Sequence, residues 1–487
     1  MSRKKILLLT PPYHCGVVES AGRWPSLALL YLAGELRKAG FEPIYYDAMS
    51  RFHTLEKILS EVESIKPDVV AVTTITATYP AAQSVLAGVK ALDPNIVTVA
   101  GGVHASFSYH EILTQTTAVD YCVIEEGEVT LPELLLAHFA GGDVAVVRGV
   151  AFRRGEEVVA TPRRPFIQDL DVLTPAWDLI DFREYPLYFI EDSRVAIVSS
   201  SRGCVYECAF CSQRQFWQGT YRQRSPEAFV AEIEYLVKHK AVNAFFIADE
   251  YPTYSRERWV KILDLLIEKD LGINILMETC VVDIVRDADI LDKYRKAGVM
   301  FIYMGVEAMG QDRLDAYNKN VKIEQSRDAL RLVKEAGMIS ESSLILGMPD
   351  ETPETIQRTL DLAKTYGAHY MHFLFITPWP YVGLWHTLKD HIEEYDYAKY
   401  NLVHPIVKPN AMSRDELFKQ VLRCYREYYS SKISDWYNLP KTDFRRRCLL
   451  MGLKAIFENS FLRAHMGSMH EMPQQLKGVI HKIFAEF

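Results

Sequence analysis

Short apolar runs alternate with amphipathic segments along the first 140 residues of the chain. The apolar runs predict β-strands at residues 5–10, 43–48, 68–75, 96–102 and 121–128. The amphipathic segments predict helices at residues 25–40, 53–65 and 79–92. Strands separated by helices of about 10–15 residues are typical of βαβ units in a parallel sheet. We therefore expect a Rossmann-like α/β domain with a doubly wound parallel sheet in residues 1–140, with ligands bound at the carboxyl ends of its strands.

The alternation stops over residues 141–190, where glycines and prolines predict a short β-hairpin followed by a linker. It resumes with strands expected at residues 195–200, 244–249, 275–280, 301–307, 342–348 and 371–377. Six βα units are too few for a closed eightfold barrel, so residues 191–385 are expected to form a partial (β/α)6 barrel. Residues 386–487 lack the strand pattern and predict a helical C-terminal region, with helices at 413–430 and 444–459.

Composition narrows the classes of protein that fit this pattern. The chain has 487 residues, of which 49% are hydrophobic and 24% charged, as in globular proteins, and its net charge is −8. A protein whose main partner is nucleic acid needs a basic surface, so the negative net charge argues against nucleic acid as the partner. The longest uncharged stretch, residues 69–89, contains threonines, a proline and a glutamine, which predicts no transmembrane segment. We expect a cytoplasmic protein, in which the 8 cysteines stay reduced.

Three of these cysteines carry the clearest chemical signal. Cys204, Cys208 and Cys211 have the spacing C-x3-C-x2-C directly after the first strand of the second series. Three thiolates on one loop can hold three irons of a [4Fe–4S] cluster and leave the fourth iron open to a small molecule. A zinc site is the alternative, but it would need a histidine nearby, and the next one is His239. The spacing therefore favours the cluster over zinc and over inert core cysteines.

This spacing, with Phe210 before the last cysteine, resembles that of the radical S-adenosylmethionine (SAM) superfamily. The resemblance implies that SAM binds the open iron and yields a 5′-deoxyadenosyl radical, which abstracts a substrate hydrogen. It further implies SAM contacts at Phe210, Asp249, Glu250, Glu307 and Gly347. The second strand ends in Ala248-Asp249-Glu250, where the superfamily usually has Gly-Gly-Glu. This departure leaves the contact atom on that strand open.

An α/β domain ahead of such a barrel resembles the cobalamin-binding subclass of the superfamily. The segments AGGVHASF (residues 100–107) and EEGE (125–128) match its glycine-rich loops, in which backbone without Cβ can approach a corrin ring. The resemblance implies cobalamin contacts at Gly101, Gly102, His104, Glu126 and Gly127. The cobalt-ligating motif D-x-H-x-x-G is absent from the sequence, so His104 and His14 are interpreted as polar loop residues rather than cobalt ligands.

A closer resemblance, to the anaerobic magnesium-protoporphyrin IX monomethyl ester oxidative cyclases (the BchE family), covers nearly the whole chain. It rests on residues 20–40, 100–107, 211–217, 247–253, 377–384 and 395–418. It implies closure of the isocyclic ring of (bacterio)chlorophyll, with oxygen drawn from water and hydrogen abstracted from the propionate side arm. Residues 463–487 depart from the family's pattern. Trp379 and Tyr381, after the sixth barrel strand, are candidates to line a pocket for the flat tetrapyrrole, with packing of the tail helices as the alternative.

Two other functions remain open from the sequence. A cobalamin-dependent radical SAM methyltransferase acting on an unactivated carbon would use the same residues. A non-catalytic metal or nucleic-acid binding module is disfavoured by the net charge. A flavodoxin or ferredoxin is the expected electron donor, and the basic run Arg445–Arg447 is either its docking site or a solvated helix face. No residue is assigned to catalytic proton or water steps.

Overall fold

The computed structural model describes residues 3–15 and 21–459, which form two compact units. The first unit holds the described residues up to His14 together with Pro25–Asp181 and Asp396–Ala398. The second unit holds the other described residues. The segment 463–487, which departs from the cyclase pattern, lies outside the described residues.

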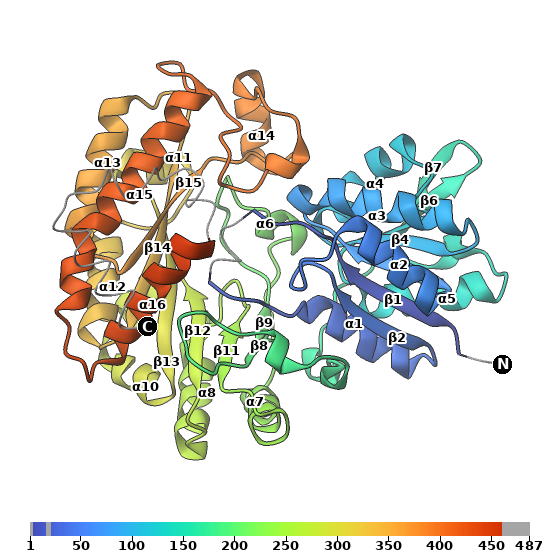
Figure 1. The fold of residues 1–487 in the computed structure, drawn as a ribbon, viewed down its shortest axis with the longest axis horizontal. Helices are drawn as coiled ribbons and strands as arrows, with labels where there is room; N and C mark the ends of the chain where they lie inside the picture. Colours follow the sequence, from blue (N-terminus) through green and yellow to red (C-terminus); the bar gives the residue numbers. More distant parts are fainter. Residues whose placement is uncertain (1–2, 16–20, 460–487) are drawn as a thin grey trace. The chain divides into compact units, whose positions relative to one another are not determined.

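A seven-stranded sheet forms the centre of the first unit (Figure 1). Its order is β2-β1-β3-β4-β5-β6-β7, with β1 to β5 parallel and β6 and β7 antiparallel. The strands are β1 (Lys5–Thr10), β2 (Glu42–Asp47), β3 (Val69–Thr73), β4 (Val97–Gly101), β5 (Tyr121–Val123), β6 (Val150–Arg154) and β7 (Glu157–Ala160). The order reverses between β1 and β3, which confirms the predicted doubly wound topology.

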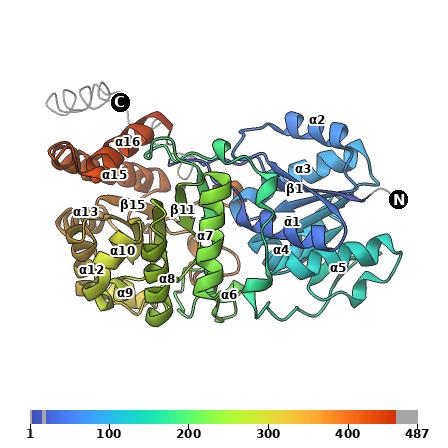
Figure 2. The ribbon, with the colours of Figure 1, turned by 90° about the horizontal axis from the view of Figure 1, so that it is seen from below.

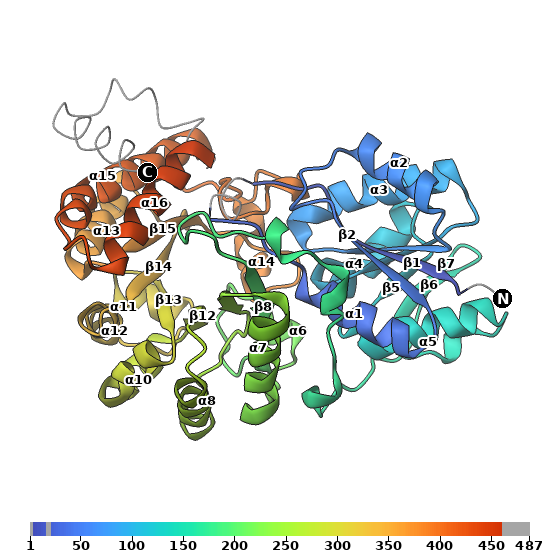
Figure 3. The same ribbon diagram turned by 60° about the horizontal axis from the view of Figure 1, so that its bottom comes forward.

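Five helices cover the two faces of this sheet. They are α1 (Leu27–Lys38), α2 (Leu55–Ile65), α3 (Tyr79–Leu92), α4 (Val103–Gln115) and α5 (Gly127–Phe139). Helices α1 and α5 pack together on one face, and α2 and α3 lie on the other (Figure 3). Residues of α4 share the apolar core of α2 and α3. Because helices cover both faces, β1 is buried throughout its apolar run, Ile6–Leu9.

The end of the sheet differs from the sequence prediction. The fifth strand was expected over residues 121–128, but β5 ends at Val123, and Glu125 has a φ of +63° that turns the chain. The hairpin expected in the linker is β6 and β7, and it belongs to the sheet: Ala151 pairs with Cys122 of β5. Pairing satisfies the otherwise open edge of β5, which a hydrophobicity pattern does not reveal.

Six parallel strands in the order β15-β14-β13-β12-β11-β8 form the main sheet of the second unit. They are β8 (Val195–Val198), β11 (Ala244–Ile247), β12 (Asn274–Thr279), β13 (Val299–Glu307), β14 (Ile339–Leu346) and β15 (Tyr370–Phe375). The outermost strands β8 and β15 do not pair with each other, so the expected open (β/α)6 barrel is confirmed. A two-stranded sheet is formed by β9 (Ser201–Arg202) and β10 (Arg222–Gln223).

Helices lie along one side of the six strands, as Figures 2 and 3 show for α7, α8, α10, α12 and α13. The helices of this unit up to β15 are α6 (Gln213–Phe216), α7 (Pro226–Lys240), α8 (Arg256–Lys269), α9 (Val281–Arg286), α10 (Leu291–Lys296), α11 (Gln311–Ala316), α12 (Ile323–Glu335) and α13 (Pro353–Tyr366). The later helices are α14 (Gly383–Leu388), α15 (Arg414–Tyr437) and α16 (Phe444–Asn459).

The long helix α15 closes the open edge at β15. Tyr425 accepts a hydrogen bond from the backbone N–H of Phe373 at 3.1 Å. Tyr428 donates to the carbonyl of Ala368 at 2.6 Å, and Tyr429 donates to the carbonyl of Met371 at 3.2 Å. These backbone groups lie in or next to β15, whose other side pairs with β14, so the tyrosines satisfy an edge that would otherwise be open. The three tyrosines are structural.

Gly102, at the carboxyl end of β4, is required by close packing of the chain. Its φ is +91°, and a Cβ at this position would lie 2.5 Å from the carbonyl oxygen of Thr74. Gly40 has the same φ of +91°, but a Cβ there would meet nothing within 4 Å. We expect Gly40→Ala to cost about 1–2 kcal/mol of unfolding free energy through left-handed backbone strain alone. Gly102→Ala should cost more than about 3 kcal/mol because the backbone must also move. Denaturant unfolding of both variants measures the difference, and equal losses would contradict the packing argument.

Candidate functional site

Cys204, Cys208 and Cys211 lie on the loop between β9 and α6, and all three are free and part-buried. Burial raises the pKa of each thiol, to about 12 for Cys211, whose value Cys208 and Cys204 raise further. The N–H of Gln213 donates to Sγ of Cys211 at 3.5 Å. Bound iron would replace these protons, and N–H···S bonds are among the contacts that tune iron–sulfur clusters. The three thiols on one turn fit the donor set of a [4Fe–4S] cluster.

Within residues 3–15 and 21–459, no three or more His, Cys, Asp or Glu side chains are gathered as for a single metal ion. The assignment of these cysteines as cluster ligands therefore rests on their spacing in the sequence and stays a prediction.

Asp249 holds the start of the cysteine loop in place. Its carboxylate is buried and accepts hydrogen bonds from the N–H of Ser200 at 2.7 Å and the hydroxyls of Ser200 and Ser201 at 2.5 and 2.7 Å. These serines lie between β8 and the cysteines. The Asp249 side chain thus positions the start of the cysteine loop, and its predicted contact with SAM stays a prediction.

Glu250 lies beside the same loop with its carboxylate held at both oxygens. Trp217 donates its Nε1–H to Oε1 at 2.8 Å, and the N–H of Gly203 approaches Oε2 at 3.3 Å. Burial raises the pKa of Glu250. Gly203 has a φ of +104°, and a Cβ there would lie 2.1 Å from the carbonyl oxygen of Thr220. The residue before Cys204 must therefore be glycine, and this close approach places Glu250 next to the thiols.

Glu307 ends β13 in a strained conformation with a φ of +65°, after a shift in register against β14. Lys319 forms an ion pair with its Oε1 at 3.0 Å, and the Ser343 hydroxyl donates to Oε2 at 3.1 Å. Burial opposes the charge of Lys319, but the Glu307 carboxylate raises its pKa above the ordinary value. Sequence analysis did not identify Lys319 or Ser343, because neither forms part of a recognisable motif.

Phe210 and Gly347 lie on the same side of the barrel. The Phe210 ring packs edge-on against Tyr317 with centroids 5.4 Å apart, and it shares an apolar cluster with Ile345 and Met348. Gly347 has a φ of +97°, and its N–H donates to Oε2 of Glu351 at 2.7 Å. The predicted aromatic residue and the predicted glycine turn are therefore joined through one cluster, as a shared SAM pocket would require.

Trp379 and Tyr381 are part-buried in the loop between β15 and α14. Trp379 donates its Nε1–H to the carbonyl of Tyr400 at 3.4 Å. The N–H of Leu384, in α14, donates to the carbonyl of Ala209 at 3.3 Å. Since Ala209 lies between Cys208 and Cys211, the aromatic loop is anchored next to the cysteine loop.

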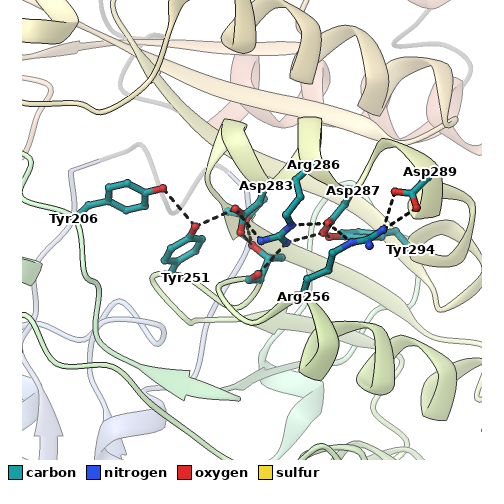
Figure 4. Close-up of polar contacts among 10 residues, drawn as sticks. Tyr206, Tyr251, Arg256, Asp283, Arg286, Asp287, Asp289 and Tyr294 are labelled. Atoms are coloured by element: carbon teal, nitrogen blue, oxygen red, sulfur yellow. Dashed lines mark hydrogen bonds and ion pairs between the residues drawn. The ribbon is translucent and has the colours of Figure 1, made fainter.

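A polar network links the cysteine loop to the helices outside the barrel (Figure 4). The hydroxyl of Tyr206, between Cys204 and Cys208, lies 3.4 Å from that of Tyr251. Tyr251 in turn donates to Oδ1 of Asp283 at 3.0 Å. Arg286 pairs with Asp283 at 3.2 Å, which anchors this route on α9.

The network continues around Asp287, which is fully buried. Its carboxylate accepts from Arg286 at 2.7 Å, from Arg256 at 3.0 Å and from the Tyr294 hydroxyl at 2.7 Å. Arg256 also contacts Asp289 at 2.7 Å (Figure 4). A buried carboxylate that is paired and hydrogen-bonded on several sides keeps its partners in one conformation. The network around Asp287, which supports Tyr251 through Asp283, is therefore expected to be rigid.

The predicted cobalamin residues of the first unit lie where β4 and β5 end. Gly101 ends β4, Gly102 precedes α4, and Glu126 and Gly127 begin α5. A Cβ at Gly127 would lie 3.0 Å from Leu32 of α1, so this glycine also serves packing. Glu126 accepts a hydrogen bond from the N–H of Ile167 at 2.8 Å. The fold thus brings both predicted loops to the carboxyl edge of one sheet.

His104 lies inside this unit. It is fully buried, its ring stacks on Tyr79 with centroids 4.5 Å apart, and burial lowers its pKa to about 4. Its Nδ1 lies 3.3 Å from the Thr76 hydroxyl, and Nε2 has no hydrogen-bond partner among the described residues. His104 is therefore a neutral core imidazole of α4, and its interpretation as a polar loop residue was wrong, because the packing of α4 against Tyr79 buries the ring. His14 is exposed and stacks on Phe52 at 4.3 Å.

The basic run Arg445–Arg447 is held within the second unit. Arg446 is buried and donates to the carbonyl of Tyr437 at 3.1 Å. Arg445 pairs with Asp443 at 2.6 Å, and Arg447 pairs with Glu191. These contacts assign the run to the packing of α16.

Family models match the chain in two regions. The B12 binding domain matches residues 13–135, and the radical SAM superfamily matches residues 198–363. The anaerobic magnesium-protoporphyrin IX monomethyl ester cyclase of Rubrivivax gelatinosus is 38% identical over 94% of this chain and 83% of its own length. This chain belongs to that cyclase family. Its cofactors are a [4Fe–4S] cluster, SAM and cobalamin.

Two further similarities are to a methyltransferase and to a solved structure. An uncharacterized methyltransferase of Pyrococcus horikoshii is 26% identical over 88% of this chain and 93% of its own length. The solved structure of the radical SAM methyltransferase TsrM from Kitasatospora setae, with cobalamin and a [4Fe–4S] cluster bound, has a TM-score of 0.67. That similarity, at 16% identity, covers 93% of this chain and 99% of the TsrM chain and shows a shared fold. No described helix of the present chain has the length and apolar character of a membrane span.

The cysteine assignment predicts a loss of iron without a loss of fold. Cys208→Ala should lower the iron content of the reconstituted protein to a small fraction of the wild-type value and abolish SAM cleavage, since one cluster ligand is missing. Cys424→Ala, a buried cysteine of α15, is the control and should keep its iron. Metal analysis with circular dichroism measures both properties, and full iron in Cys208→Ala would refute the assignment.

The network behind the loop predicts that Tyr251 slows loss of the cluster. Tyr251→Phe removes the hydroxyl between Tyr206 and Asp283 and should cost about 1 kcal/mol of stability. Iron should then pass to a chelator faster than from the wild type, as followed by visible absorbance. Tyr254→Phe is the matched control, because Tyr254 is 46% exposed. Equal release rates for both variants would show that the network does not hold the loop.

Proposed function

We propose that this protein catalyses the anaerobic oxidative cyclisation of magnesium-protoporphyrin IX monomethyl ester, which forms the isocyclic ring of (bacterio)chlorophyll. The observation that carries the proposal is the extent of the identity to the Rubrivivax cyclase, 38% over 94% of the chain. The radical SAM model, the later of the two domain models, ends at residue 363. The similarity to the Rubrivivax cyclase also covers most of the chain beyond that residue. Substrate-specific residues are expected there, because the radical SAM core is shared by enzymes of many activities.

Different residues of the second unit bind the cluster and the separate parts of SAM. Cys204, Cys208 and Cys211 hold the cluster on a loop that Asp249 positions. Glu250 and Glu307 present carboxylates from the ends of β11 and β13 for the amino and ribose groups of SAM. Phe210 and the turn at Gly347 line the adenine side. When bound, the cluster and SAM supply the one-electron chemistry that removes a hydrogen atom from an unactivated carbon.

The substrate and the corrin require different surfaces. Trp379 and Tyr381 present aromatic faces from a loop that is anchored to the cysteine loop through Ala209, which suits a flat apolar ring. In the first unit, the loops at Gly101-Gly102 and Glu126-Gly127 form the cobalamin edge of the sheet. His104, which follows the first of these loops, is buried against Tyr79, so we assign it to the apolar core and not to the cobalamin site.

The reaction also needs an electron donor, for which we propose a flavodoxin or ferredoxin. The contacts of Arg445–Arg447 within the protein argue against that run as the docking site. We also propose a cytoplasmic location, because the cluster ligands must be thiolates and thiols stay reduced there.

A second candidate function is methyl transfer to an unactivated carbon of another substrate. Its support is the methyltransferase of Pyrococcus horikoshii, which matches 88% of this chain at 26% identity. Methyl transfer consumes a second SAM and releases S-adenosylhomocysteine, whereas cyclisation does not. The two functions therefore differ in their SAM products.

The deciding experiment is an anaerobic reaction of the reconstituted protein with cobalamin, reductant, SAM and magnesium-protoporphyrin IX monomethyl ester. We expect 5′-deoxyadenosine and a cyclised porphyrin without S-adenosylhomocysteine, as detected by mass spectrometry. S-adenosylhomocysteine together with a methylated product would assign the methyltransferase function. An unchanged porphyrin in the presence of 5′-deoxyadenosine would refute the proposed substrate.

A further inference from the structure

The inner face of the barrel carries a row of polar side chains that no cofactor motif accounts for. Glu278 of β12 pairs in register with Tyr303 of β13, which pairs with Glu341 of β14. Along β12, Ile275, Met277 and Thr279 are buried on the opposite face, since side chains alternate along a strand. The row is therefore directed into the barrel.

Three members of this region already have partners. Tyr303 donates to the Ser343 hydroxyl at 2.6 Å, and Ser343 donates to Glu307. Glu341 forms a hydrogen bond with Nε2 of His372 on β15. These contacts form two polar groups, one across β13 and β14 and one across β14 and β15.

Glu278 differs from its neighbours. Its side chain makes no hydrogen bond or ion pair among the described residues, and it is part-buried one residue before the end of β12. Burial raises its pKa to about 7, and the carboxylates of Glu341, Glu250 and Glu307 raise it in the same direction. Glu250 and Glu307 are the residues proposed to hold SAM on the strands at either side of β12. Glu278 thus lies between the two SAM contacts.

Glu278 is part-buried, and its carboxyl makes no hydrogen bond or ion pair among the described residues, so its contacts within the protein give no structural reason for a carboxyl at this position. A carboxyl that is half ionised near neutral pH is suited to accept a proton and release it again. The other groups that face Glu278 are less suited: Glu341 is already bonded to His372, and Glu307 to Lys319. The interior of the barrel therefore offers one carboxylate, within its described residues, that is both free and next to the SAM site.

We propose that Glu278 is the proton acceptor for the addition of water to the substrate side arm. This inference rests on the proposed cyclisation, in which the new oxygen comes from water. Loss of a hydrogen atom to the 5′-deoxyadenosyl radical, and then of one electron to a one-electron acceptor, leaves the side-arm carbon electron-poor. The water oxygen forms the C–O bond to this carbon while one of its O–H bonds breaks. The proton passes to the Glu278 carboxylate, and no electron is transferred in this step. The polar group of Tyr303 and Ser343 borders the site where this proton is held.

The sign of the pH dependence follows from this role. Glu278 must be ionised to accept a proton, so cyclised product per 5′-deoxyadenosine should fall as pH drops through about 7. The groups that face Glu278, namely Glu250, Tyr303, Glu307 and Glu341, are present in the wild type and in the variant alike.

Glu278→Gln tests the proposal with the full-length, reconstituted protein. Cyclised product per 5′-deoxyadenosine should fall about 10²-fold, and the remaining activity should lose its dependence on pH near 7. Glu278→Asp should recover part of the product. Glu268→Gln, on the exposed side of α8, is the matched control and should behave as the wild type. The melting temperature of Glu278→Gln should be equal to or above the wild-type value, because a purely structural role would lower it.

The possible results separate the two proposals. If the wild type cyclises the porphyrin and Glu278→Gln does so equally well with the same pH profile, the role of Glu278 is refuted and the cyclase function stands. If the wild type cleaves SAM but leaves the porphyrin unchanged, the cyclase function fails, and the water-addition step fails with it. Infrared titration of the wild type against Glu278→Gln checks the carboxyl without substrate. Absence of a group that titrates near pH 7 would also overturn the proposal.

Discussion

Electrostatic repulsion among closely spaced carboxylates constrains the carboxyl edge of the barrel in the second unit. Glu250, Glu278 and Glu307 lie at or close to the carboxyl ends of the neighbouring parallel strands β11, β12 and β13, so the topology brings three acids to one edge. In a low-dielectric interior such charges repel strongly. Glu307 is neutralised by Lys319, Glu250 is held by Trp217 and Gly203, and Glu278 has a pKa raised to about 7. The repulsion is thus relieved in a different way at each acid. The paired or hydrogen-bonded acids suit SAM binding, and the acid with the raised pKa suits proton transfer.

The rest of the second unit keeps this edge rigid. Asp249 fixes the start of the cysteine loop, and the Tyr206–Tyr251–Asp283 contacts tie its middle to a paired and buried ionic network. On the far strand, tyrosines of α15 satisfy the backbone edge of β15 that would otherwise be open. Rigid support of this kind keeps binding groups oriented before ligands arrive, which lowers the cost of binding.

In the first unit, residues that match a cobalamin loop motif are not by that match shown to contact the ligand. Gly102 and Gly127 match the predicted cobalamin loops, yet the nearest atoms to their missing side chains belong to Thr74 and Leu32 of the protein itself. His104, in the same motif, is a buried neutral ring. Positions 102 and 127 are glycine because the chain packs closely there, so the glycines of the motif are explained by packing within the protein before any ligand is considered.

The sequence alone determined the two α/β units, the six parallel barrel strands and the three cysteines, because alternation and motif spacing are local properties of the chain. It missed the attachment of the hairpin to the first sheet, since strand pairing depends on an edge left open elsewhere. It also missed Lys319, the Glu341–His372 pair and Glu278. Glu278 and Glu341 are 63 residues apart in the chain but share one row through Tyr303. Only the tertiary structure decided these contacts, because register across strands, and not sequence spacing, sets which side chains meet.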